Sequence, residues 1–107
     1  MLFLVTAEHI PDAAELRKGL VAPHVAYLNR CKHQFVGSGP LLADEADTDL
    51  GMVLILDMPS RKDLDLFLQE EPYNKGGLLR SIEIRRWRFG SADTNRKDII
   101  TTEGSNP

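Results

Sequence analysis

The chain has 107 residues, of which 42% are hydrophobic and 27% are charged, the composition of a single small globular domain. Its formal net charge of -3 at pH 7 offers no basic surface for nucleic acid, and no apolar run approaches the roughly 20 residues of a membrane-spanning helix. A single cysteine cannot form an internal disulfide, so we expect a protein of the reducing cytoplasm.

The first part of the chain predicts a strand followed by a long helix. Residues 2–6 are apolar and β-forming, in a run too short for the core of a signal peptide. We expect a helix from about residue 13 to about residue 32. Asp12 is expected to cap this helix, with Glu15 completing a capping-box pattern three positions later.

Pro23 stands inside this predicted helix. Proline removes a backbone hydrogen bond and its ring clashes with the preceding turn, so the helix is expected to kink near residues 19–22 or to restart at Pro23. A restart would place His24 in a helical first turn, where the positive end of the helix dipole disfavours a protonated imidazole.

Strands and a second helix follow in the remainder of the chain. In order, we expect a strand at 34–42 with a bend or bulge at Gly39-Pro40, an acidic and solvated loop at 43–50, a strand at 52–56, a helix at 61–70 capped by Ser60, a short turn or helix at 71–77, and a strand at 81–89. The domain is expected to end near residue 90, with residues 91–107 as a mobile tail.

This order, β-α-β-β-α-β, predicts a ferredoxin-like α+β fold, in which two helices cover one face of a four-stranded antiparallel sheet. The strands at 2–6 and 52–56 are apolar at consecutive positions, as if both of their faces were buried. Face-to-face packing of two sheets in a homodimer would bury the second face, and a ligand cleft is a compatible alternative.

The last strand separates its side chains by parity. Ile82 and Ile84 share one side and are expected to face the helices. Glu83, Arg85, Trp87 and Phe89 share the other side, and this mixture of charged and aromatic residues suits a partly wet cleft, a dimer surface or a solvated edge.

His24 is the leading candidate for chemistry. It falls at helical spacing in a stripe of core-type residues, namely Leu16, Leu20, Tyr27, Leu28 and Cys31. An imidazole on that face points toward the interior or a cleft and needs a partner there. Cys31 has no activating neighbour and is expected to be an inert thiol, while His9 and His33 flank elements and are expected at the surface.

No sequence pattern indicates a metal or another cofactor. The histidines lack zinc-ligand spacing, the acidic loop at 43–50 lacks the glycine and spacing of a calcium loop, and no phosphate-binding glycine loop is present. We therefore expect a site that works without a cofactor. Haem ligation by His24 is a further possibility, but no other residue supports it.

Four segments, in this order and spacing, resemble the YCII-related family of small bacterial proteins over roughly residues 1–89. They are Arg17 and His24 with the following Val25-Ala26-Tyr27-Leu28; Gly37-Ser38-Gly39-Pro40; Glu71-Pro72-Tyr73-Asn74-Lys75-Gly76-Gly77; and Glu83-Ile84-Arg85-Arg86-Trp87. The resemblance implies a dimeric α/β barrel of ferredoxin-like domains, similar in fold to muconolactone isomerases and a chloromuconolactone dehalogenase.

The resemblance also implies an active site built from the helix histidine, His24, and the acidic residue before Pro-Tyr. The family usually has aspartate at that position, whereas this chain has Glu71, whose carboxylate lies one methylene further from the backbone. His9 stands at the end of the first strand, where relatives often carry an acid.

A His24–Glu71 dyad would suit general acid–base chemistry on a small carbonyl-bearing or anionic ligand, such as isomerisation, elimination or hydrolysis. Arg17 or Arg85 would hold a ligand carboxylate, and Ser38 and Tyr73 would supply hydroxyl groups. The alternative is a non-catalytic ligand-binding or structural dimer module, in which His24 and Glu71 form a buried polar link.

Overall fold

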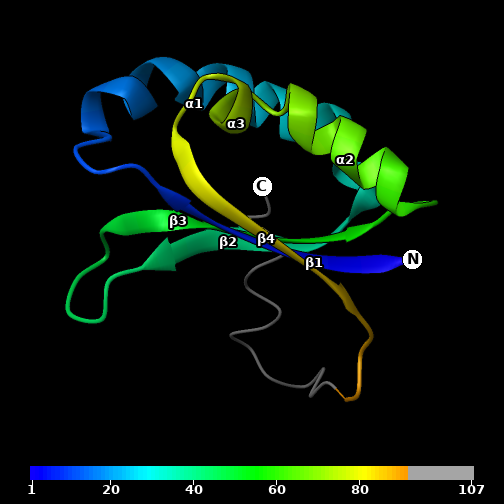
Figure 1. Ribbon diagram of the computed structural model, residues 1–107. Helices are drawn as coiled ribbons and strands as arrows, with labels where there is room; N and C mark the ends of the chain where they lie inside the picture. The colour runs from blue at the N-terminus through cyan, green and yellow to red at the C-terminus, as the bar shows by residue number, and fades with distance from the viewer. Residues whose placement is uncertain (92–107) are drawn as a thin grey trace.

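A four-stranded antiparallel sheet with helices on one face forms the domain, as the order of elements predicted (Figure 1). The computed structural model describes residues 1–91, so the tail expected at 91–107 lies outside the described residues apart from its first residue. The strands are β1 (Leu2–His9), β2 (Phe35–Leu42), β3 (Asp49–Asp57) and β4 (Leu79–Trp87), in the sheet order β2-β3-β1-β4. The helices are α1 (Ala14–Arg30), α2 (Arg61–Glu70) and the four-residue α3 (Pro72–Lys75), and a 3-10 turn at Lys32–Gln34 links α1 to β2.

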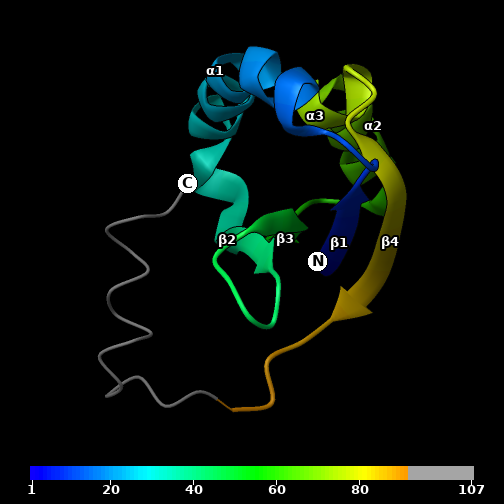
Figure 2. The same cartoon turned by 90° about the vertical axis from the view of Figure 1, so that its left-hand side faces the viewer.

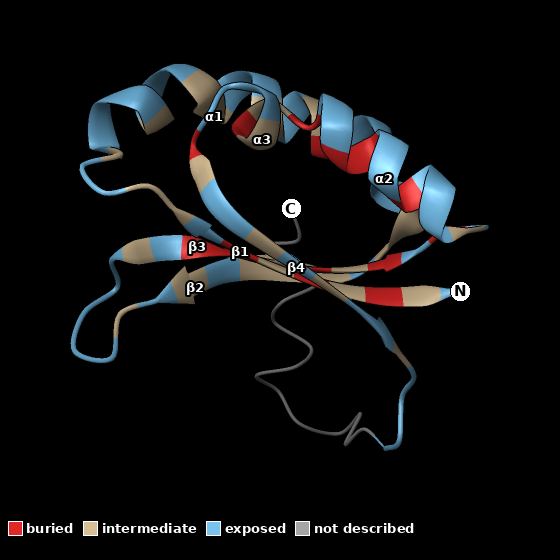
Figure 3. Cartoon of the chain, in the orientation of Figure 1, coloured by how far each residue is buried: buried red, intermediate tan, exposed pale blue. Residues whose placement is uncertain are grey.

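The core lies between the helices and one face of the sheet (Figure 3). Alternate residues of β1, namely Phe3, Val5 and Ala7, are buried because successive side chains of a strand point to opposite faces. The other members of this cluster are Met52, Leu54 and Leu56 from β3, Leu28 from α1, Leu64, Phe67 and Leu68 from α2, Tyr73 from α3, and Met58 and Leu78. Ile82 and Ile84 of β4 pack against this cluster, which confirms their predicted parity.

No described helix or strand covers the opposite face of the sheet (Figure 2). Leu4 pairs there with Ile55 on one side and with Arg85 on the other, and Leu2 lies opposite Trp87. The two central strands are therefore apolar on both faces, as expected, but within one chain only the helix-facing side is fully buried. The consequence is a partly exposed apolar sheet face.

Helix α1 differs from its prediction at its N-cap and at Pro23, where the expected restart does not occur. Asp12 adopts a left-handed conformation with φ 55° and does not cap the helix; Ala13 occupies the N-cap position without a side-chain hydrogen bond. Glu15 contacts Lys18 on the surface instead of completing a capping box. The helix then passes through Pro23 without a break, and Pro23 lies on its exposed side. His24 is thus in the interior of α1 and not in a first turn.

The other helix cap was predicted correctly. The backbone N–H of Asp63 donates to Ser60 Oγ at 3.1 Å, and the Ser60 hydroxyl donates to the Asp63 carboxylate at 2.7 Å. Strand β2 has no bend or bulge at Gly39-Pro40; its register shifts lie at either end, between Phe35 and Gly37 and between Leu41 and Leu42.

Gly51 sets how closely β3 approaches β1. A Cβ atom built on Gly51 would overlap the carbonyl oxygen of Ala7, whereas one built on Gly19 in α1 would meet nothing within 4 Å. We predict that Gly51→Ala lowers the free energy of unfolding by about 1–3 kcal/mol, because the two strands must separate to admit the methyl group. Gly19→Ala is the control and should raise it by roughly 0.5–1 kcal/mol. Urea denaturation of both variants checks this, and equal effects would contradict the packing described.

Candidate active site

A cavity of about 370 Å³ opens between α1 and the helix-facing side of β2 and β3. Its walls include four of the residues singled out in the sequence: Arg17, His24, Ser38 and Tyr73. Arg17 and His24 project from α1, Ser38 comes from β2, and Tyr73 comes from α3. Residues distant in sequence are thus brought to one hollow.

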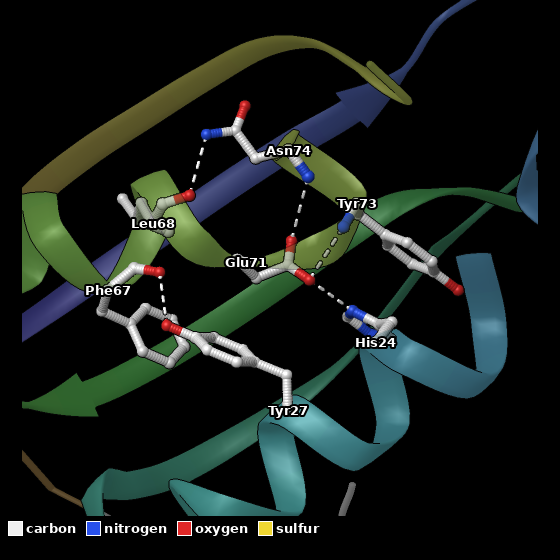
Figure 4. A network of polar contacts seen from close by, with 7 residues as sticks. All are labelled: His24, Tyr27, Phe67, Leu68, Glu71, Tyr73 and Asn74. Carbon is white, nitrogen blue, oxygen red and sulfur yellow. Dashed lines mark hydrogen bonds and ion pairs between the residues drawn. The ribbon is translucent and has the colours of Figure 1, made fainter. Parts of the chain in front are cut away.

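His24 and Glu71 are in direct contact at the cavity wall (Figure 4). The distance from His24 Nδ1 to Glu71 Oε2 is 2.6 Å, and the side chains are 12% and 0% exposed. A carboxylate in its ionised form only accepts hydrogen bonds, and in that form of Glu71 the proton of this contact belongs to Nδ1. Nε2 is then the ring nitrogen of His24 left for a ligand.

The Glu71 carboxylate is held by the backbone as well as by His24. Glu71 is the N-cap of α3, and its oxygens accept the N–H of Tyr73 at 3.0 Å and the N–H of Asn74 at 3.3 Å (Figure 4). The Asn74 side chain donates to the carbonyl of Leu68 at 2.9 Å and so fixes the turn between α2 and α3. These donors offset the large desolvation penalty of a fully buried carboxylate.

Tyr73 packs flat against His24, with ring centroids 3.6 Å apart and planes within 1°. Burial raises the pKa of the Tyr73 hydroxyl, and the neighbouring Arg17 guanidinium opposes that rise. Tyr73 therefore keeps its proton at neutral pH and can donate it in a hydrogen bond. The stacked ring also fixes the plane of the imidazole.

Asp49 was expected in a solvated loop, but it is the first residue of β3 and forms an ion pair with Arg17 at 2.7 Å. This contact joins α1 to the sheet at the end of the cavity. Strand β3 begins three residues earlier than the apolar pattern at 52–56 indicated, and nothing in the local sequence distinguishes Asp49 from its acidic neighbours.

His9 was expected at the surface, and this expectation was wrong. It lines the cavity and approaches Tyr73 edge-on, with ring centroids 6.0 Å apart. Burial lowers the pKa of His9, and the positive charge of Arg17 lowers it further. A signal was available, because extending the alternation of Phe3, Val5 and Ala7 by one step reaches His9 on the helix side.

Arg85 lies apart from these residues. It pairs with Leu4 on the sheet face away from the helices and is exposed, with its guanidinium 3.4 Å from the Ile84 carbonyl. It does not line this cavity.

Within residues 1–91, no group of three or more His, Cys, Asp or Glu side chains is arranged to hold a metal ion. No helix in that range has the length and apolarity of a membrane span. Cys31 is a free, half-buried thiol.

Comparison with known proteins places this arrangement in a family. The model of the YCII-related domain matches residues 1–88. The chain belongs to the YCII-related domain family. Comparison with curated proteins gave no match. Among solved structures, 5-chloro-2-hydroxyhydroquinone dehydrochlorinase from Burkholderia phenoliruptrix AC1100, solved with 2,5-dihydroxybenzoquinone, is similar with a TM-score of 0.79 and 31% identity. The match covers 84% of this chain and 96% of the dehydrochlorinase, and it confirms the fold inferred for this YCII-related domain.

The buried carboxylate leads to a stability prediction. Glu71→Ala removes the partner of His24 and of two backbone N–H groups, so it should lower the free energy of unfolding by about 1–3 kcal/mol. Glu70→Ala is the control, because the adjacent Glu70 is exposed and pairs with Lys75 at the surface; it should cost less than about 1 kcal/mol. Thermal or urea unfolding measures both, and similar losses would show that the carboxylate contacts contribute little.

Proposed function

We propose that this YCII-related domain is a small-molecule enzyme that works without a cofactor, and that His24 exchanges protons with a ligand in the cavity. The contact between His24 Nδ1 and the fully buried Glu71 carboxylate carries the proposal, because it fixes both the orientation and the protonated nitrogen of the ring. The coarser conclusion, an enzyme-like role on small molecules, agrees with the likeness to the dehydrochlorinase.

In the proposed mechanism, His24 Nε2 takes or gives a proton at the ligand. Glu71 stabilises the positive charge that forms on the ring when Nε2 accepts a proton. Arg17, Ser38 and Tyr73 line the same cavity and would bind ligand oxygens, including a negative charge that develops during reaction. This set of groups suits isomerisation, elimination or hydrolysis beside a carbonyl.

The proposed ligand class is a small ring bearing several oxygen atoms. A cavity of about 370 Å³ accommodates a single substituted ring, and its walls combine apolar side chains with a few convergent polar groups. The similar dehydrochlorinase was solved with 2,5-dihydroxybenzoquinone, a ring of this kind. That compound is therefore a suitable first probe for this chain.

We also propose that two chains form a homodimer through the uncovered sheet faces. Leu4, Val53 and Ile55 form an apolar centre on that face. Trp87 adds an aromatic group, and its ring centroid lies 4.3 Å from that of Phe89. Burying such a surface against a second copy would remove a large apolar patch from water. Arg85 and Glu83 would then lie in or near the interface.

A non-catalytic structural module is the second candidate. It is favoured by the structural roles of the same residues, since Glu71 caps α3 and His24 stacks on Tyr73. In that case the His24–Glu71 contact would hold α1 against α3 and would respond to no ligand.

Ligand binding separates the two candidates. We predict that wild-type protein binds 2,5-dihydroxybenzoquinone and that His24→Gln weakens the binding at least about tenfold, because a hydrogen bond to a charged group is lost. His33→Gln, which changes an exposed histidine, should bind like the wild type. Isothermal titration calorimetry measures the dissociation constants. No binding by the wild type, together with a lower melting temperature for His24→Gln, would favour the structural module.

The homodimer is tested by sedimentation velocity at micromolar concentration. The wild type should sediment as a particle of about twice the chain mass of 12.0 kDa. Ile55→Lys should shift it to the monomer, because a charge would be buried at the centre of the apolar face. Leu66→Lys is the control, since Leu66 is 53% exposed on α2, and it should remain dimeric. A monomeric wild type would contradict the proposed interface.

A further inference from the structure

The cavity contains a second histidine for which the proposed mechanism has no role. His9 lies at the end of β1, lines the same hollow as His24, and contacts the same tyrosine ring. His24 packs against the face of Tyr73, whereas the ring of His9 stands at 89° to it. Two imidazoles are thus arranged around one aromatic ring, at the wall of a cavity sized for a small molecule.

The polar atoms beside His9 are incompletely paired. His9 Nε2 and Arg17 Nε are buried and have no hydrogen-bond partner among the residues that the structure describes. A buried polar atom without a partner is destabilising, and in a native structure it calls for an explanation such as a catalytic role.

The two histidines have opposite electrostatic surroundings. The neighbour of His24 is the Glu71 carboxylate, 2.6 Å away. The charged groups acting on His9 are Arg17 and His24 from α1, which disfavour its protonation, and Asp49 from β3, which favours it. Burial and Arg17 prevail and lower the pKa of His9, so its ring is neutral at pH 7 and ready to accept a proton. Pairs of titratable groups in such contrasting environments are typical of sites with one acid and one base.

We propose that His9 is a second proton-transfer residue of this site, and that it accepts the proton of an acidic hydroxyl group, such as an enol or a hydroxyquinone, carried by the ligand. Arg17, held by Asp49 at 2.7 Å, would bind the resulting oxyanion through its free Nε–H. This inference rests on the proposed function, since it assumes that a ligand occupies the cavity and that His24 acts on it.

The proton balance of the simplest such step is closed. The hydroxyl proton moves to a ring nitrogen of His9, and the O–H electron pair becomes the second bond of a new carbonyl group. The adjacent C=C pair takes a proton from the protonated His24, so that one C–H bond forms and one O–H bond breaks. The ligand is tautomerised without gain or loss of atoms or electrons, and solvent restores the two histidines to their starting charges.

The test is the number of protons taken up when the protein binds 2,5-dihydroxybenzoquinone at pH 7, measured by calorimetry in buffers of different ionisation enthalpy. The ionised probe stands for the oxyanion that forms after His9 has taken the hydroxyl proton. Its negative charge favours the protonated His9 ring, so the wild type should take up protons from solvent on binding. His9→Gln should lose most of this uptake and bind about tenfold more weakly, while His33→Gln should match the wild type. A His9→Gln protein with unchanged uptake and affinity would overturn the inference.

Two further results keep the inference separate from the proposed function. If His24→Gln loses binding but His9→Gln does not, only the role of His9 fails; if the wild type does not bind the probe, both fail. If the His9→Gln variant does not fold, an NMR titration of the histidine rings in the wild type tests the inference without it. The His9 ring should titrate below the usual histidine range in the free protein and at higher pH with the probe bound. An identical His9 midpoint in the two titrations would overturn the inference.

Discussion

The buried carboxylate of Glu71 is the constraint on which the site depends. A charged group with no exposed surface is retained only when donors replace the water that it lost, and here two backbone N–H groups and one imidazole do so. The same atoms begin α3, fix the ring of His24 and set where Tyr73 lies. Local helix capping and the proposed chemistry therefore share one group, and a change at Glu71 acts on both.

The parts of this arrangement that depend on local sequence could be predicted from it. The pairing of His24 with Glu71, which are 47 residues apart in the chain, came from the resemblance to the YCII-related family. Pro72 has the pattern of a helix start, because proline is favoured at the first helical position, whereas glutamate is not among the preferred N-cap residues. The helical stripe also predicts which face of α1 carries His24, and this is the face that contacts the Glu71 carboxylate. The stripe was less accurate at its beginning, where Leu16 is exposed because that turn of α1 contributes nothing to the buried core.

The errors arose where tertiary structure decides. Asp12 has the side chain of a good cap, but its left-handed backbone turns the chain before the helix begins. Asp49 lies at the site because β3 begins there, before the apolar residues of the strand. His9 lies at the site because β1 continues as far as His9. Hairpin length and strand ends depend on cross-strand pairing, which composition does not specify. For His9, the alternation along β1 gives the side of the sheet but not whether the strand extends that far. Asp49 and His9, the two residues that were missed, are both titratable. Together with Arg17 they supply the charged and proton-binding groups at one end of the cavity.

The central claim is that Glu71 holds the His24 ring with Nδ1 protonated and Nε2 directed to a ligand. Long-range ¹H–¹⁵N correlation spectra of the histidine rings, recorded with and without 2,5-dihydroxybenzoquinone, test it most directly. The account predicts a protonated Nδ1 in both spectra and a ¹⁵N shift at Nε2 on addition of the probe. An unprotonated Nδ1 in the free protein, or an Nε2 resonance that the probe leaves unchanged, would contradict it.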